Sequence, residues 1–300
     1  MKNLFFIPFA FDANKASGLN IGKENVLEIY LKNLCVALLS AKKSNADTDV
    51  ALVCNMKIPE FYEKLLLDHG VLIYIEPFET FVFPDDTPWC LAFYKLCALE
   101  KMIAKGDYDY YIYTDADVFV QESLDSAFQE LKDHILLYDI HYGLGVEDYR
   151  LTLKEFREYG IETCITQYGG EFFGASHENA EKFVEQCKAV YEEMRRKNFI
   201  TAKGDEFITS IAASKMKHLV KNAGGYIFRF WTGRFYLVST CYKNGGIAIL
   251  HLPAEKQRGI LKLFTYFVRK GTFPKKEKVH KICHLNGQPI RYKITSILRK

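Results

Sequence analysis

The chain has 300 residues, 49% of them hydrophobic, and a formal net charge of +3, so it is long enough for one large α/β domain or two small ones. No apolar stretch reaches the roughly 18 residues of a membrane span, and no internal repeat or low-complexity linker is present. The eight cysteines include no C-x-x-C pair, and several stand in apolar stretches. They predict reduced core residues of a cytosolic protein rather than a disulfide framework.

The first 75 residues predict alternating strands and helices. Leu4–Phe9 is expected to be a strand rather than a signal peptide, because the apolar run is short, holds Pro8 and has no small-x-small cleavage site. The elements that follow are a helix over Lys23–Lys43, a strand over Asp49–Cys54, a helix over Pro59–His69 and a strand over Val71–Ile75. This alternation implies right-handed crossovers and a parallel sheet.

A pair of carboxylates follows a buried strand in the middle of the chain. A helix predicted over Trp89–Ile103 leads into a strand over Asp109–Thr114, and Asp115 and Asp117 come directly after it. Open α/β sheets place their sites at the carboxyl ends of strands, and two repelling carboxylates there favour a bound cation. Mg²⁺ or Mn²⁺ suits oxygen ligands and leaves positions for a diphosphate. The alternative is a solvated turn with a helix cap.

This pattern resembles the Asp-x-Asp motif of glycosyltransferases with the GT-A fold, an α/β fold whose mostly parallel central sheet is flanked by helices. The resemblance implies that Asp117 ligates the metal and that Asp115 contacts both the metal and the ribose of a nucleotide-sugar donor. It also implies a donor contact from Lys95 in the preceding helix, although that helix is amphipathic and could serve only the core. The base and ribose would lie where the first strand ends, at Phe9, Ala10 and Phe11.

The second half of the chain continues the α/β pattern. Its predicted elements are a helix over Leu124–Leu131, a strand over Ile135–Ile140, an excursion over 142–165 with a helix near Leu153–Tyr159, an extended segment over Gly169–Ala175, helices over His177–Asn198 and Asp205–Met216, and strands over Tyr226–Phe230 and Ile247–His251. The glycines of the extended segment would allow its backbone to approach a ligand closely.

The order Tyr168–Ser176, long helix, Asp205-Glu206 resembles the blood-group ABO type of retaining glycosyltransferases over roughly residues 85–230. That resemblance implies that Asp205 hydrogen-bonds the donor sugar and that Glu206 lies under its anomeric carbon, as nucleophile or as stabiliser of an oxocarbenium-like state. A carboxylate there stabilises the transition state more than the ground state. Gly204 stands where this family usually has His. The alternative is that both acids merely favour a helix N-terminus.

His251 and Lys256 resemble the late His-x-x-Gly-x-x-Lys element of bacterial and glycogenin-like galactosyl- and glucosyltransferases. In that element the His is a third protein ligand to Mn²⁺ and the Lys pairs with the diphosphate, which suits an imidazole and a lone ammonium. Here Ala254 replaces the Gly, and the Lys comes one residue early. A plain histidine at a strand end is the alternative for His251.

The end of the chain is strongly basic. From Gln257 to Lys300 there are 12 Lys and Arg residues and one acidic residue, Glu277, so this segment carries about +11 and residues 1–256 about −8. Cations interleaved with Leu263, Phe264, Tyr266 and Phe267 suit an anionic membrane face, and bacterial lipopolysaccharide glycosyltransferases have similar ends. A solvated tail or nucleic-acid binding are the alternatives; no nucleic-acid motif is visible, and we expect no such partner.

Together these patterns predict a GT-A catalytic domain over 1–256 and a basic tail over 257–300. The expected activity is metal-dependent transfer of a hexose from a nucleotide sugar, a UDP-sugar by preference, to a glycan or lipid-linked acceptor, with retention of configuration. An inverting enzyme with Asp205 or Glu206 as general base is the close alternative. A haloacid-dehalogenase-type phosphatase and a non-catalytic glycan-binding homologue are the others. The expected location is the cytoplasm, with the tail on the inner face of the cell membrane.

Overall fold

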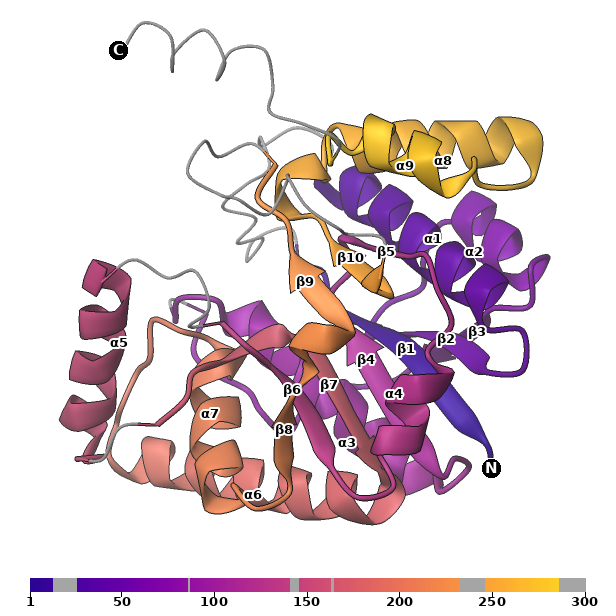
Figure 1. Cartoon of the computed structure of the whole chain (residues 1–300). Helices are drawn as coiled ribbons and strands as arrows, with labels where there is room; N and C mark the ends of the chain where they lie inside the picture. The colour runs from indigo at the N-terminus through magenta and orange to yellow at the C-terminus, as the bar shows by residue number, and fades with distance from the viewer. Residues whose placement is uncertain (13–25, 86, 141–145, 163–164, 233–245, 286–300) are drawn as a thin grey trace, which may run out of the picture.

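The computed structural model describes residues 1–12, 26–85, 87–140, 146–162, 165–232 and 246–285. A seven-stranded sheet with the order β3-β2-β1-β4-β7-β6-β8 lies beside a three-stranded sheet with the order β5-β10-β9 (Figure 1). The strands are β1 (Asn3–Phe9), β2 (Asp49–Cys54), β3 (Leu72–Ile75), β4 (Tyr110–Thr114), β5 (Val118–Val120), β6 (Ile135–Asp139), β7 (Tyr168–Ser176), β8 (Val220–Asn222), β9 (Ile227–Arg229) and β10 (Ile249–His251).

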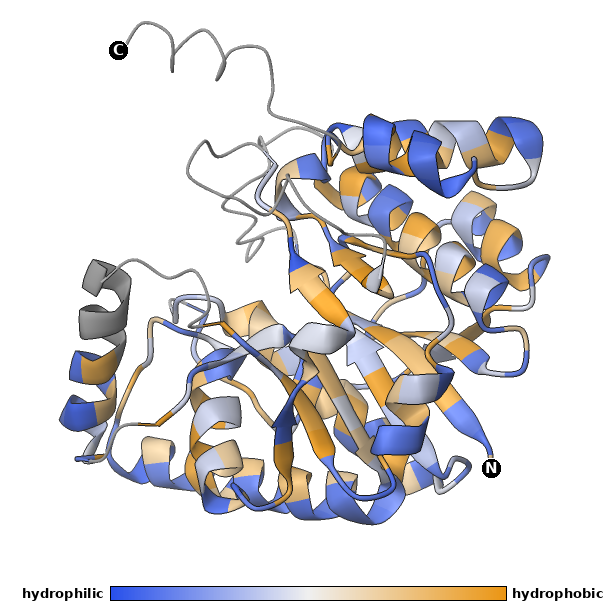
Figure 2. Cartoon of the chain, viewed as in Figure 1, coloured by the Kyte–Doolittle hydropathy of each residue, from blue (hydrophilic) through white to orange (hydrophobic). Residues whose placement is uncertain are grey.

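Helices cover both faces of the large sheet. They are α1 (Val26–Ser44), α2 (Glu60–Leu67), α3 (Tyr94–Lys105), α4 (Asp125–Glu130), α5 (Val146–Tyr159), α6 (His177–Arg196), α7 (Asp205–Lys215), α8 (Gly259–Lys270) and α9 (Lys276–Ile282). Short 3₁₀ turns lie at Cys90–Phe93, Ala223–Gly225 and Pro253–Glu255. Hydrophobic residues concentrate along the strands, and hydrophilic residues on the outer sides of the helices (Figure 2).

The strand pairing follows from these connections. β3, β2, β1 and β4 are parallel, as right-handed crossovers through α1, α2 and α3 require. β7 runs antiparallel to both of its neighbours, β4 and β6, and β6 is parallel to β8. The predicted α/β fold with a mostly parallel central sheet flanked by helices is therefore confirmed.

Successive residues of the strands point to opposite faces and so build two separate cores. In β1, Phe5 and Ile7 join a core with α1, α2 and α8, whereas Leu4 and Phe6 join a core with α3, α6 and α7. Because both faces are covered, the strands are apolar at nearly every position, as expected for parallel strands.

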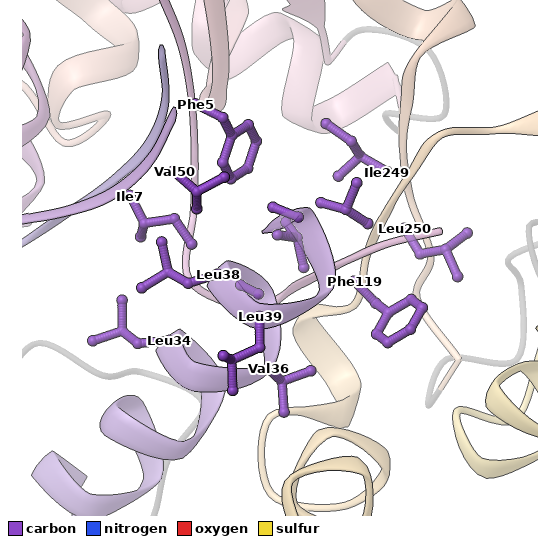
Figure 3. Packing of buried hydrophobic residues seen from close by; sticks show 14 of the residues in the cluster. Phe5, Ile7, Leu34, Val36, Leu38, Leu39, Val50, Phe119, Ile249 and Leu250 are labelled. Carbon is purple, nitrogen blue, oxygen red and sulfur yellow. The ribbon is translucent and has the colours of Figure 1, made fainter. Parts of the chain in front are cut away.

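Helix α1 holds the two sheets together. Its Leu34 and Leu38 pack toward Phe5 of the large sheet, and the same cluster includes Phe119 of β5 and Ile249 of β10 (Figure 3). All are less than 6% exposed, and burying each such side chain contributes roughly 1.5–3 kcal/mol. The small sheet is thereby fixed against the carboxyl end of β4.

Two predicted helices differ in extent from the structure, and two short strands were not predicted. The helix expected near Leu153–Tyr159 begins at Val146, as α5. The helix expected over Trp89–Ile103 is a 3₁₀ turn followed by α3, because Trp89 adopts a left-handed backbone with φ +59°. Strands β5 and β8 were not predicted, since each has three residues and no alternating pattern can be recognised over so short a span. Residues 23–25, the first of the helix predicted from Lys23, lie outside the described residues, and α1 is described from Val26.

The basic end of the chain contains α8 and α9 as far as residue 285. Leu263, Phe264 and Phe267 of α8 are buried in the same core as α1, so these side chains are not available to a membrane, contrary to the sequence-based expectation. Residues 286–300 lie outside the described part of the chain. None of the described helices is both long and apolar enough to cross a bilayer.

Six cysteines fall within the described residues, and all six are free thiols. Cys90 is half-buried and the other five are buried, as the apolar surroundings in the sequence indicated. Cys164 and Cys241 lie outside the described residues.

Candidate active site

The Asp115–Asp117 turn joins the two sheets. It leaves β4 of the large sheet and enters β5 of the small one. The backbone amide of Asp115 donates to the carbonyl of Glu171 on β7 at 3.2 Å, and the amide of Leu252 donates to the carbonyl of Asp117 at 2.8 Å. The turn is therefore fixed from both sheets at once.

The small sheet brings His251 to this turn. His251 on β10 pairs in register with Val118 on one side and with Arg229 of β9 on the other. Its Nε2 lies 3.3 Å from Asp117 Oδ2 and 3.9 Å from Asp115 Oδ2. One ligand atom from each of these three side chains lies within 4.8 Å of the others.

The chemistry of this cluster fits a divalent cation. Two carboxylates and one imidazole are donors that Mn²⁺ accepts together. Asp117 is 3% exposed, and its Oδ2 makes no hydrogen bond of good geometry with any described residue, although Lys256 Nζ and His251 Nε2 lie within 3.3 Å of it. Burial opposes the ionised form of Asp117, but Lys256 and His251 outweigh it and hold its pKa far below the ordinary value. Asp117 is therefore held in its anionic form, the form that could ligate a cation.

The histidine is charged in the absence of metal. Burial opposes its protonation, but the carboxylates of Asp117 and Glu171 outweigh burial and raise the pKa of His251 to about 9. A metal ion binds neutral imidazole, so binding at this cluster would displace that proton.

A small pocket opens beside the cluster. Lys256 reaches into it with Nζ 3.2 Å from Asp117 Oδ2. The pocket has a volume of about 160 Å³, and its lining brings together the residues predicted to contact the nucleotide and diphosphate, whereas Asp205 and Glu206, predicted to contact the sugar, do not line it. It is lined by Phe9, Ala10, Phe11, Tyr30, Trp89, Leu91, Ala92, Tyr94, Lys95, Asp115, Ala116, Asp117 and Lys256.

Lys95 connects the metal cluster to the second acidic pair. Its buried Nζ lies 3.1 Å from Asp115 Oδ1 and 3.2 Å from Asp205 Oδ2, and it donates to the carbonyl of Gly170 at 3.0 Å. Burial opposes its charge, but Asp115 and Asp205 outweigh burial and raise the pKa of Lys95 well above the ordinary value. Lys95 is thus a permanent cation between two carboxylates.

Gly170 makes room for this pair. A Cβ on Gly170 would lie 2.3 Å from Asp205 Oδ2 and 2.5 Å from Lys95 Nζ. The expectation that this glycine admits a ligand close to the backbone is thus wrong in one respect, because the protein's own side chains fill the space.

Asp205 and Glu206 begin α7. Gly204 precedes them with φ +64°, a conformation that favours glycine over the His usual in the ABO-type family, and a Cβ there would lie 3.0 Å from Trp89 Cβ. Glu206 Oε2 accepts a hydrogen bond from Gln167 Nε2 at 2.8 Å. Burial raises the pKa of Glu206 to about 7 and, against the opposing charge of Lys95, that of Asp205 to about 6.

The structure adds three polar side chains that were not predicted. Glu171 Oε1 lies 2.6 Å from Arg229 Nη2 and 3.4 Å from His251 Nδ1, and Arg229 Nη2 lies 3.8 Å from Glu206 Oε1. Gln167 is the third, as the donor to Glu206. A sequence signal existed for Glu171: a carboxylate between Gly170 and Phe172 in a buried strand requires a partner. The pairing with Arg229 depends on sheet register and has no such signal.

Comparisons with known proteins bear on the fold. Neither a family profile nor a curated protein matches this sequence. Among solved structures, mouse xyloside xylosyltransferase 1 in its apo form superposes with a TM-score of 0.51 at 12% identity, over 83% of this chain and 96% of that chain. At this identity the likeness shows the fold alone. The chain has a GT-A-like glycosyltransferase fold, with an Asp-Asp-His cluster that could hold a divalent metal.

Proposed function

We propose that the protein is a metal-dependent glycosyltransferase that moves a hexose from a nucleotide sugar to a glycan or lipid-linked glycan. The observation that carries the proposal is the convergence of Asp115, Asp117 and His251 at the sheet edge of a GT-A-like fold. The pocket beside them supports it, since it is lined by aromatic side chains, two lysines and both aspartates, a lining suited to a nucleotide diphosphate.

In this proposal Asp115, Asp117 and His251 hold Mn²⁺ or Mg²⁺. The ion would supply charge neutralisation for the leaving diphosphate. Lys256, which lies on the pocket side of Asp117, would pair with a diphosphate oxygen. Lys95, which lines the pocket, would keep Asp115 and the buried Asp205 at fixed positions.

Glu206 is our candidate for the group next to the anomeric carbon. Its carboxyl is held by Gln167 and faces Arg229, and its pKa of about 7 leaves a substantial ionised fraction at neutral pH. An ionised Glu206 would stabilise developing positive charge at the sugar or attack it. Retention of configuration rests on the sequence resemblance, and an inverting enzyme would instead use Glu206 or Asp205 as general base.

The test is a donor screen. UDP- and GDP-sugars are incubated with the protein in the presence and absence of Mn²⁺, and thermal stabilisation, nucleotide release and phosphate release are measured. The expected result is stabilisation by one nucleotide sugar that requires the metal, followed by slow nucleotide release to water. Release of inorganic phosphate from a phosphomonoester would favour a phosphatase, and donor binding without any turnover on a panel of glycan acceptors would favour a non-catalytic homologue.

We further propose that helix α8 docks the enzyme on an anionic membrane face, near a lipid-linked acceptor. Arg258, Lys262, Arg269 and Lys270 line one surface groove along α8 and form no ion pair within the described part of the chain. Because Leu263, Phe264 and Phe267 are buried, docking would depend mainly on these cations, with Tyr266 half-buried in the same groove. Each cation is worth about 1 kcal/mol near anionic lipid.

A further inference from the structure

A buried carboxylate lies behind the metal cluster and is not part of it. Glu171 is 1% exposed, and its Oε1 lies 3.4 Å from His251 Nδ1, on the side of the ring away from the two aspartates. The other ring nitrogen, Nε2, is the one that faces Asp117 and Asp115. The imidazole therefore stands between one carboxylate behind it and two in front.

The position of Glu171 is fixed by its neighbours. Arg229 contacts Glu171 Oε1 with both Nε and Nη2 at 2.6 Å. Burial opposes the ionised form of Glu171, but Arg229 and His251 outweigh burial and lower its pKa to about 2. Arg229 stands next to His251 in the register of β9 and β10, so the small sheet delivers both contacts together. A Cβ at Gly169 would lie 1.8 Å from Glu171 Oε2, so the absence of a side chain at Gly169 leaves room for this carboxylate.

We propose that Glu171 is a positioning residue for the metal ligand His251. Its Oε1, 3.4 Å away, would accept the Nδ1 proton, which makes no other hydrogen bond of good geometry within the described part of the chain, and the lone pair of Nε2 would then be free for a metal ion. A carboxylate behind a ligating histidine fixes the tautomer and the ring orientation and makes the ligating nitrogen more basic. Arg229 holds Glu171 in this place and compensates its charge, so that Glu171 does not move forward to become a ligand itself. The inference rests on the metal site of the proposed function.

The first experiment measures metal binding without any substrate. Mn²⁺ affinity is determined by EPR titration, and coupling of the bound Mn²⁺ to ¹⁴N is measured by electron spin echo envelope modulation. Wild type should show the nitrogen coupling, and His251→Ala should lose it and bind Mn²⁺ more weakly. Glu171→Leu/Arg229→Met, which removes both charges together, should lose the coupling and about 10- to 100-fold in affinity. Glu171→Gln keeps an acceptor oxygen and should retain the coupling.

A double-mutant comparison distinguishes positioning from a direct effect of charge. In the His251→Ala background, changing Glu171 should not weaken Mn²⁺ binding further, because Glu171 acts through the ring. A further loss of tenfold or more there would overturn the proposal, as would unchanged affinity and coupling in Glu171→Leu/Arg229→Met. If wild type binds Mn²⁺ through nitrogen but Glu171 has no influence, only this inference fails. If wild type binds no Mn²⁺, the metal site and this inference fail together.

A second measurement needs no change at Glu171 and applies even if the paired variant does not fold. In protein labelled with ¹⁵N-histidine and loaded with Zn²⁺, NMR reports which ring nitrogen carries the proton. His251 is assigned by the signal missing from His251→Ala. The proposal expects a protonated Nδ1 with a hydrogen-bonded proton shifted downfield, and a metal-bound Nε2. A metal-bound Nδ1 would contradict it.

Discussion

Lys95 lies between the two acidic pairs of the site, and Asp117 of one pair differs in its electrostatics from Asp205 and Glu206 of the other. In the metal cluster, Lys256 and His251 outweigh burial and keep Asp117 ionised far below its ordinary pKa. At the start of α7, burial dominates and raises the pKa of Asp205 to about 6 and of Glu206 to about 7. Aspartate therefore behaves in two ways: nearby cations outweigh burial at Asp117, whereas burial outweighs Lys95 at Asp205, although its Nζ lies 3.2 Å away.

The difference in pKa between Asp117 and the pair Asp205 and Glu206 suits two chemical roles. A metal ligand must remain charged so that the cation stays bound, whereas a group that acts on a sugar during reaction benefits from a pKa near the working pH. Lys95 contacts one carboxylate of each pair and is the physical connection between them.

The largest loss of activity is expected when Asp117 in the candidate metal cluster is changed. Asp117→Asn removes one anionic ligand, so Mn²⁺ should no longer stabilise the protein against heat, and transfer should fall by about 10³-fold, the equivalent of several kcal/mol of charge stabilisation. Asp109→Asn, at the exposed opposite end of the same strand region, is the matched control and should change neither quantity. Near wild-type turnover that still requires metal in a folded Asp117→Asn protein would remove Asp117 from the ligand set.

Removing the charge of Lys95, which lies between Asp115 and Asp205, should lower the free energy of unfolding. Lys95→Met leaves Asp115 and Asp205 facing each other without their shared cation, and removing one partner of a buried ion pair costs about 3–5 kcal/mol. The free energy of unfolding is measured by denaturant titration, with Lys101→Met on the same helix as control. Adding Asp205→Asn to Lys95→Met should restore part of the loss. If the single variant is as stable as wild type, Lys95 does not hold the two pairs together.

These effects separate what the sequence predicts from what only the fold provides. Asp115, Asp117, Asp205 and Glu206 stand at element boundaries with recognisable neighbours, so local patterns indicated them. The three-residue strand β5 has no local pattern, whereas strands at β9 and β10 were predicted. Their register with one another has no local signal, yet it sets His251 beside Arg229 and opposite Val118. Glu171 and Arg229 could not be paired in advance, because 58 residues separate them and only β10 brings them together.

The packing of the basic end of the chain could not be predicted from local sequence patterns either. The charge count correctly located the cations of α8, but a basic amphipathic pattern fits a membrane-bound helix and a helix packed on the core equally well. The packing of Leu263, Phe264 and Phe267 against the α1 core decides between them, and that information is long-range.

The raised pKa of Glu206 should make the free energy of unfolding depend on pH. Because the pKa of Glu206 in the folded state is raised from 4.5 to about 7, its contribution to stability is complete below pH 4.5 and is lost as the pH rises through 7. Glu206→Gln removes that dependence. The unfolding free energy of the variant minus that of wild type should therefore rise between pH 5 and pH 8, by an amount on the order of 2 kcal/mol given the partial exposure of the carboxyl.

Glu178→Gln is the control for this measurement, since Glu178 is also in the first turn of a helix but is fully exposed. Its difference from wild type should stay nearly constant over the same range. If Glu206→Gln shows an equally flat profile, Glu206 is ionised throughout and the contrast with the metal side disappears.

The smallest effect is expected at the surface of α8, far from either acidic pair. Neutralising Lys262, Arg269 and Lys270 to Gln should weaken binding to phosphatidylglycerol vesicles by about 1 kcal/mol for each cation, and wild-type binding should fall as salt screens these charges. The control neutralises Lys182, Arg195 and Arg196 on α6, which covers the opposite face of the sheet. Donor hydrolysis in solution should stay unchanged in both variants, because the apolar face of α8 and its packing on α1 are untouched. Equal vesicle binding by the two variants would mean that general charge, rather than this helix, brings the protein to the lipid.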